Sequence, residues 1–368
     1  LWYHDHSLGM TRLNVYAGMA GFWIVRDDVE DSLNLPGPAP RLRDEPETKY
    51  FEIPIAIQDR SFNADGSLFY PGSRTFFDGY DGPFIPDSSV PPIWNPEFFG
   101  DTMVVNGRTW PYLEVEPRKY RLRLLNGCNS RFLILKTDRP LTFHQIGSEG
   151  GLLPDAPVAL TQLLMAPAER ADVIVDFSSF EPGDEIILLN LGPDSPFGGL
   201  PVDPEDQADP ETTGQVMKFK VVELTGEDTS EIPAELPPIE PLTTELPARD
   251  LTLNEEMDEQ AGIPIAALLG TGAAGPLSWS ADVTETPTSG DTEVWRILNL
   301  TEDAHPVHLH LVMFQVLDRT PFDADAYHQA QAEYLEGDKS GPPPDPKDFA
   351  EGDPVERNSW EAGLKDTV

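Results

Sequence analysis

The amino-acid sequence predicts an all-β protein built from Greek-key β-sandwich domains. Short runs rich in β-branched and aromatic residues recur along the chain, and turn residues separate them at short intervals. Proline is abundant, with 38 in 368 residues, which favours rigid loops over long helices. The hydrophobic content of 39% is enough to form buried cores, and the length predicts two or three domains.

Residues 1–28 carry the histidines His4 and His6 and then a glycine-containing run at 18–25 that we expect to form a pair of strands. This region is too short to fold alone, so we expect it to be the last piece of a first domain whose beginning lies outside the chain. Residues 29–48 contain four prolines and many charged residues, and are predicted to be a linker.

A second β-sandwich domain is predicted over residues 49–225, followed by a Pro- and Glu-rich linker over 226–248. Its candidate strands share short, apolar, β-branched sequences bounded by turn residues, and lie at 51–57, 120–125, 132–135, 172–177, 185–189 and 216–221.

Residues 249–368 are predicted to form a third domain that is cut short at its C-terminal end. Its candidate strands include 293–298 and 314–317, and a long loop is expected over 336–353 because of its prolines and charges.

The net charge of −39 excludes nucleic acid as a partner, because phosphate contacts require a basic surface. The same charge disfavours binding to an anionic membrane. An acid-rich surface in which arginine outnumbers lysine suits either a salt-adapted protein or an acidic extracellular one, and both remain open. The single cysteine, Cys128, has no histidine near it in sequence and is expected to be a small buried or turn residue.

Five of the seven histidines lie in two clusters at opposite ends of the chain: His4 with His6, and His305 with His308 and His310. Both clusters lie in stretches predicted to be β-strand, where alternate side chains point the same way. The members of each close pair therefore share a face, whereas His305 is expected on the opposite face. Imidazole clusters are suited to copper, so the pattern predicts two metal centres, one on each side of a strand.

The chain resembles the multicopper oxidases, and among them the branch of bacterial spore-coat laccases and bilirubin oxidases. The resemblance runs along nearly the whole chain. It implies that the predicted domains are cupredoxin-like, and that the chain is a fragment lacking the first and last of the family's four histidine motifs. The matching stretches are 1–6, 11–18, 105–107, 110–115, 147–151, 166–170, 305–310 and 316–319.

By this resemblance, His305 ligates a type 1 copper, where the reductant is oxidised, and is the catalytic residue. His308 ligates a type 2 copper, and His4, His6 and His310 ligate a binuclear type 3 pair. The implied activity is that of a laccase, which couples one-electron oxidation of small phenolic or aromatic substrates to four-electron reduction of dioxygen to water. The last motif carries the cysteine of the type 1 site, so we expect the chain as given to be inactive.

Reductants of this family dock beside the type 1 histidine, so Thr301 and Ala304 are candidates for a substrate pocket. The loop at Phe197 and Gly198 is another candidate, although its glycines favour an ordinary turn.

Three further polar residues need not belong to a metal site. Asp5 either hydrogen-bonds a neighbouring ligand or is simply solvated. His144 is expected to be a strand residue, and His328 an exposed residue on a short helix.

Two alternatives to a laccase remain open. The same family includes oxidases of Cu(I) or Mn(II), for which a methionine-rich or acidic patch near the type 1 site is expected. A non-catalytic copper-binding or structural protein is the other. An extracellular, cell-surface or coat location is expected from the resemblance.

Overall fold

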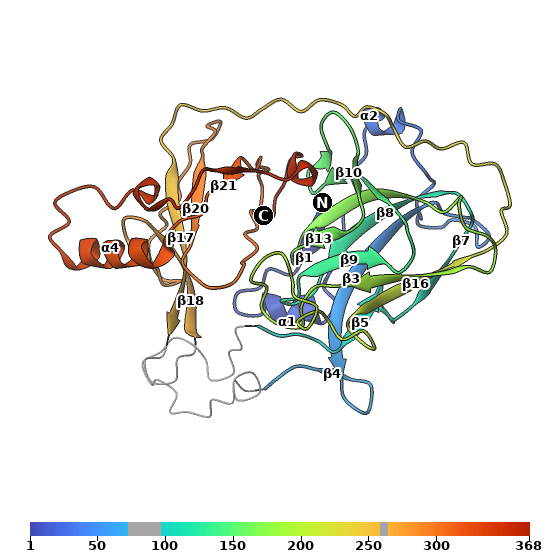
Figure 1. Ribbon diagram of the computed structural model, residues 1–368, viewed down its shortest axis with the longest axis horizontal. Coiled ribbons are helices and arrows are strands. Elements are labelled where there is room, and N and C mark those ends of the chain that lie inside the picture. Colours follow the sequence, from blue (N-terminus) through green and yellow to red (C-terminus); the bar gives the residue numbers. More distant parts are fainter. Residues whose placement is uncertain (73–96, 258–263) are drawn as a thin grey trace.

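The computed structural model describes residues 1–72, 97–257 and 264–368, and most of its regular structure is β-strand (Figure 1). Within these ranges, none of the helices has the length and hydrophobicity needed to span a bilayer.

A β-sandwich occupies the right half of Figure 1 and consists of two packed sheets. The first sheet has the order β11-β10-β14-β8-β3-β5-β6, with β12 beside β10 and β4 beside β3. Its strands are β3 (Glu52–Phe62), β4 (Leu68–Phe69), β5 (Thr102–Val105), β6 (Arg108–Thr109), β8 (Lys119–Asn126), β10 (Phe143–Ser148), β11 (Gly151–Leu152), β12 (Val158–Leu160) and β14 (Arg170–Asp176).

The second sheet has the order β13-β9-β15-β16-β7. Its strands are β7 (Tyr112–Val115), β9 (Leu133–Thr137), β13 (Leu163–Met165), β15 (Glu185–Asn190) and β16 (Gln215–Val221). The pairs β3–β8 and β16–β7 are parallel, whereas the other strand pairs described in these two sheets are antiparallel.

The core between these sheets follows from the alternation of apolar residues along the strands. Leu122 and Leu124 of β8 and Val173 and Val175 of β14 point inward and meet Leu133 of β9, all at 1% exposure or less. Burying each such side chain contributes about 1.5–3 kcal/mol of stability. The sandwich is therefore a rigid base for the side chains on its edges.

A separate sheet forms the third region, at the left of Figure 1, in the order β19-β18-β17-β20. Gln331 of the adjoining helix α4 donates to the carbonyls of Thr271 and Gly272, which fixes the helix against this sheet. The elements of this region are β17 (Arg249–Met257), β18 (Pro264–Thr271), β19 (Gly275–Pro276), β20 (Trp295–Asn299), β21 (Asp318–Arg319), α4 (Ala324–Glu336), η1 (Pro346–Phe349), β22 (Val355–Glu356) and η2 (Ser359–Glu361).

The N-terminal residues form an antiparallel strand pair, β1 (Trp2–His4) with β2 (Ala20–Phe22), joined by helix α1 (Thr11–Tyr16). The Tyr16 hydroxyl donates to the carbonyl of Phe69 at 2.7 Å and accepts from the amide of Ser61 at 2.8 Å, which attaches α1 to the sandwich. A short helix, α2 (Asp28–Asp31), follows.

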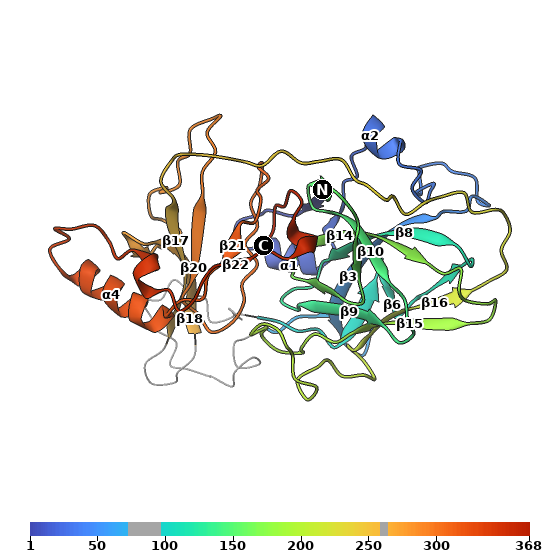
Figure 2. The same ribbon diagram turned by 45° about the horizontal axis from the view of Figure 1, so that its top comes forward.

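The stretch between the sandwich and β17 crosses the molecule as an extended segment, visible in both views (Figures 1 and 2). Ile232 and Leu236 of this segment pack on the outer face of the sandwich against Ile146 and Leu153.

Several predicted strands differ from the structure. Residues 314–317 form only an isolated bridge at Phe314, and β20 begins at Trp295. His6 lies beyond the end of β1, and 305–310 form no named strand. Residues 307–309 pair with 366–368, and Pro306 has no amide proton to donate. As predicted, His144 lies in a strand, and His328 is exposed on α4.

Candidate metal centre

Four histidines from the two ends of the chain gather at one place. The ring centroids of His308 and His310 lie 4.7 Å apart, and His310 lies 5.0 Å from His4 and 4.9 Å from His6. The His4 and His6 rings are 5.8 Å apart. Figure 1 shows the N- and C-terminal ends meeting beside the sandwich. We call these four residues the histidine centre.

Short backbone ladders explain this arrangement. Val307 and Val368 exchange two hydrogen bonds, of 2.8 and 3.0 Å, and the amide of Leu309 donates to the carbonyl of Asp366 at 2.9 Å. The segment is thus held extended, so His308 and His310 lie on one side despite the absence of a full strand. On the other side of the centre, His4 pairs with Ala20 at the end of β1.

Hydrogen bonds define which ring nitrogens are free. The Nδ1 atom of His4 lies 2.7 Å from the carbonyl oxygen of Asp5, and Nδ1 of His308 lies 2.9 Å from that of Asp366. A carbonyl can only accept, so each Nδ1 carries the proton and each Nε2 has a free lone pair. Both rings are therefore in the form that binds a metal through Nε2.

The Nε2 atoms of His4 and His310 lie 3.1 Å apart. Burial, followed by the neighbouring histidines, lowers the pKa of His310; burial is also the largest cause of the lowered pKa of His4. Lowered pKa values keep both imidazoles neutral, which is the state that ligates metals.

The ligand atoms of His4, His308 and His310 all lie within 4.8 Å of one another, so these residues fit a shared metal. His6 joins this cluster through ring contacts and, like His310, is exposed. A neutral, all-imidazole donor set is suited to copper.

His305 stands apart from the histidine centre, as its position in the sequence predicts. Its Nε2 lies 2.7 Å from the Thr301 hydroxyl oxygen, which itself donates to Asn299 or to the carbonyl of Asp303. Where the hydroxyl donates to Asn299 or Asp303, it accepts from Nε2, and Nδ1 of His305 then retains the free lone pair. This is the nitrogen available to a second metal.

An acidic cluster that was not predicted from the sequence lies beside His305. Ligand atoms of Glu255, Asp303 and His305 lie within 4.8 Å of one another. Glu97 lies close by: burial, then the charges of Asp303 and Glu255, raises its pKa to about 7. Burial and Asp303 also raise the pKa of Glu255. In a chain with 64 acidic residues, no local signal distinguishes these three.

The predicted substrate-pocket residues come together only in part. The amide of Ala304 donates to the carbonyl of Phe197 at 2.8 Å. The Phe197 ring is 6% exposed and stacks on Phe132 with centroids 4.5 Å apart, so it belongs to a small core. Gly198 is exposed, and nothing lies within 4 Å of where its Cβ would be. Thr301 contacts His305 directly.

The backbone and side-chain oxygens of Asp5 accept hydrogen bonds from different partners. Its carbonyl accepts from His4, whereas its carboxylate accepts from Ser7 and Asn14 at the turn before α1. The backbone, and not the side chain, therefore orients the neighbouring histidine.

Cys128 is buried, as expected, and burial raises the pKa of its thiol.

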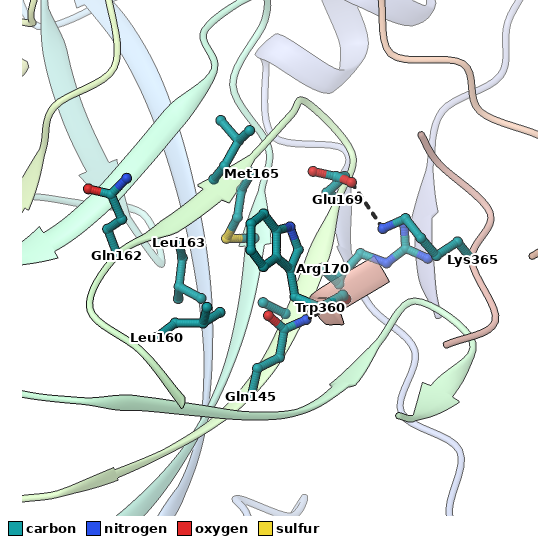
Figure 3. A pocket seen from close by; sticks show the side chains of 11 residues that line it. Gln145, Leu160, Gln162, Leu163, Met165, Glu169, Arg170, Trp360 and Lys365 are labelled. Carbon is teal, nitrogen blue, oxygen red and sulfur yellow. Dashed lines mark hydrogen bonds and ion pairs between the residues drawn. The ribbon is translucent and has the colours of Figure 1, made fainter. Parts of the chain in front are cut away.

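A small pocket lies between the sandwich and the C-terminal segment (Figure 3). Gln145, Met165 and Arg170 come from the sandwich, and Trp360 and Lys365 from the C-terminal segment. The Gln145 amide donates to the carbonyl of Trp360 at 3.2 Å. None of the predicted site residues lines this pocket.

Comparison with known proteins agrees with this geometry. A family model described as multicopper oxidase matches residues 249–368. A laccase of Bacillus stratosphericus is 44% identical over 347 residues, and a laccase of Bacillus subtilis strain 168 is 42% identical over 351 residues. These matches cover 93% and 94% of this chain and 61% of each relative. The McoA multicopper oxidase of Aquifex aeolicus has a TM-score of 0.66 at 27% identity, covering 100% of this chain and 65% of that chain.

Residues 249–368 match the multicopper oxidase family, and most of the chain is similar to laccases. The predicted family and the predicted all-β, cupredoxin-like fold class are confirmed. Family membership implies copper as the metal. The chain spans 61% of the length of the two Bacillus laccases.

Proposed function

We propose that this chain contributes half of a copper cluster and part of a mononuclear copper site to a laccase-like oxidase. The observation that carries the proposal is the meeting of His4, His308 and His310 from opposite ends of the chain, with their ligand atoms within 4.8 Å of one another. In this proposal the histidine centre lies between the first domain (1–28) and the third (249–368), with the second domain (49–225) as support.

The proposed roles are those that the resemblance to the multicopper oxidases implies. His308 holds the type 2 copper, and His4, His6 and His310 hold the type 3 pair. His305 would hold the type 1 copper. Copper bound at these positions supplies one-electron redox chemistry, and the protein supplies fixed ligand positions.

The residues around His305 define where a reductant meets the protein. The Thr301 hydroxyl fixes the ring through a hydrogen bond of 2.7 Å with Nε2, and the carboxylate of Asp303 lies 4.0 Å from the same atom. A small phenol that docks at this edge has nearby carboxylates to take the proton it loses on oxidation. The proposed partners are therefore a small aromatic reductant and dioxygen.

The test combines copper binding with turnover. Copper bound per chain is measured for the wild type, for the double variant His4→Ala/His310→Ala, and for His328→Ala, which removes an exposed histidine on α4 as a matched control. The double variant is expected to lose copper while the control keeps it. Oxygen uptake with a phenol, measured on the protein carrying all four motifs, is expected to follow copper content. Equal copper in all three proteins would contradict the proposal.

A metal-ion oxidase is a second candidate, favoured by the acidic cluster of Glu97, Glu255 and Asp303 beside His305. Carboxylates are preferred ligands of Mn(II). Rates with Mn(II), Cu(I) and a phenol are compared in the wild type and in Glu255→Gln. A loss of metal oxidation with phenol oxidation retained supports this candidate, and equal losses on both substrates exclude it.

A further inference from the structure

We propose that Arg170, a residue of the sandwich strand β14, is a positioning residue for the histidine centre and acts on His308 through Asp366 and Thr367. This inference rests on the proposed function, because it concerns residues that would hold copper. It assigns a part in the site to the middle of the chain, from which none of the proposed ligands comes.

The first contact is a buried, two-pronged ion pair. The Nη1 atom of Arg170 donates to Oδ1 of Asp366 at 2.8 Å, and Nη2 donates to Oδ2. Each side chain is 7% exposed. A guanidinium that binds both carboxylate oxygens fixes the rotation of the carboxylate as well as its position.

The second contact connects the fixed carboxylate of Asp366 to the imidazole of His308. The hydroxyl of Thr367 donates to Oδ1 of Asp366 at 2.8 Å, so its oxygen is left to accept from Nδ1 of His308, 3.0 Å away. The carbonyl of Asp366 accepts from the same Nδ1 at 2.9 Å. Both partners of Nδ1 are thus acceptors, which keeps the proton on Nδ1 and the lone pair on Nε2.

Arg170 also reaches the other half of the centre. Its guanidinium carbon lies 5.9 Å from the centre of the Trp2 ring, and Trp2 lies 4.5 Å from the ring of His4. One side chain therefore supports a histidine from each end of the chain.

The rigid sandwich fixes the starting point of this chain of contacts. Arg170 pairs with Leu125 of β8, and its amide donates to the carboxylate of Glu149 at 3.0 Å. Beside it, Lys365 bridges Glu149 and Glu169 at 2.9 and 3.0 Å, which holds the residue next to Asp366 (Figure 3). Supporting residues on rigid strands orient ligands more accurately than residues on loops.

A buried ion pair can also be purely structural, so the test needs a matched pair that does not touch the histidines. Arg121 and Asp172 provide it. They lie on the neighbouring strand and on β14 itself, Arg121 is 2% exposed, and its Nε donates to Oδ1 at 2.8 Å. Lysine keeps the charge of arginine but loses the planar fork, so Arg170→Lys and Arg121→Lys remove the same geometry at two places.

The variants Arg170→Lys, Asp366→Asn and Arg121→Lys are compared with the wild type in three measurements. Thermal unfolding reports stability. Competition with a copper chelator reports copper affinity, and ¹⁵N NMR of the copper-free protein reports which nitrogen of His308 carries the proton. We expect about 10–100-fold weaker copper binding and a mixed His308 tautomer in the first two variants. We expect Arg121→Lys to melt lower with wild-type copper affinity and tautomer.

Wild-type affinity and tautomer in both Arg170→Lys and Asp366→Asn would overturn the inference, whatever their melting temperatures. Equal changes in Arg121→Lys would also overturn it, since the effect would then be one of general stability. If the wild type binds no copper, the proposed function fails, and the NMR measurement still decides whether Arg170 fixes the His308 ring.

Discussion

The change Glu97→Gln provides a sharp test of the acidic cluster beside His305. Burial and the charges of Asp303 and Glu255 raise the pKa of Glu97 from 4.5 to about 7. A rise of that size corresponds to roughly 3 kcal/mol between the protonated and ionised forms. This is an upper value, because Glu97 keeps part of its surface in solvent.

The direction in which stability changes with pH follows from the linkage between protonation and folding. The folded protein keeps a proton on Glu97 at pH values where the unfolded chain has already released it. The associated stability is fully present below pH 4.5 and is lost as the pH rises through about 7. Glutamine cannot ionise, so Glu97→Gln escapes this loss. Relative to the wild type, the variant should gain up to roughly 3 kcal/mol of unfolding free energy between acid pH and pH 8.

Urea unfolding of the copper-free protein at pH 4.5 and pH 8, followed by tryptophan fluorescence, measures this difference. Glu185→Gln is the control, because Glu185 is an exposed carboxylate whose pKa is lowered by its hydrogen bond with Lys218. The control should gain nothing on raising the pH. Parallel pH profiles for the wild type and Glu97→Gln would refute the argument that burial and the neighbouring carboxylates raise the pKa of Glu97.

Three further predictions concern packing, reactivity and charge. Phe197→Ala should lower the free energy of unfolding by about 3–5 kcal/mol, because it leaves the buried face of Phe132 without its stacked partner; a change below about 0.5 kcal/mol in urea titration would mean that the ring is a surface residue. Cys128 should resist alkylation in the native protein and react after unfolding, because burial raises the pKa of its thiol; rapid labelling of the folded chain, detected by mass spectrometry, would contradict this. The melting temperature should rise between low and molar salt, because cations screen a net charge of −39; an unchanged melting temperature would exclude the salt-adapted interpretation.

The sequence allowed the all-β class and the histidine pairs to be predicted because both depend on local patterns. Alternation along 120–125 and 172–177 is visible without knowledge of partners, and these runs became β8 and β14. The spacing of His308 and His310 placed them on one side even though the segment is not a full strand. The predicted strand at 305–310 was wrong in its length, because backbone pairing extends only over 307–309.

The contacts around the centre could not be predicted, because they join residues far apart in the chain. Arg170 and Asp366 are 196 positions apart, and Glu255, which lies beside His305, comes from strand β17. Many arginines and carboxylates in this sequence could form such pairs. The observed pairs form because the edge of the sandwich packs against the C-terminal segment.

The central claim is that histidines from opposite ends of the chain hold copper together. Anomalous X-ray diffraction at the copper edge, on crystals of the copper-loaded protein, tests it most directly. The account predicts anomalous density among His4, His308 and His310, adjoining His6. Copper found only at surface carboxylates, with no density at the histidine centre, would contradict it.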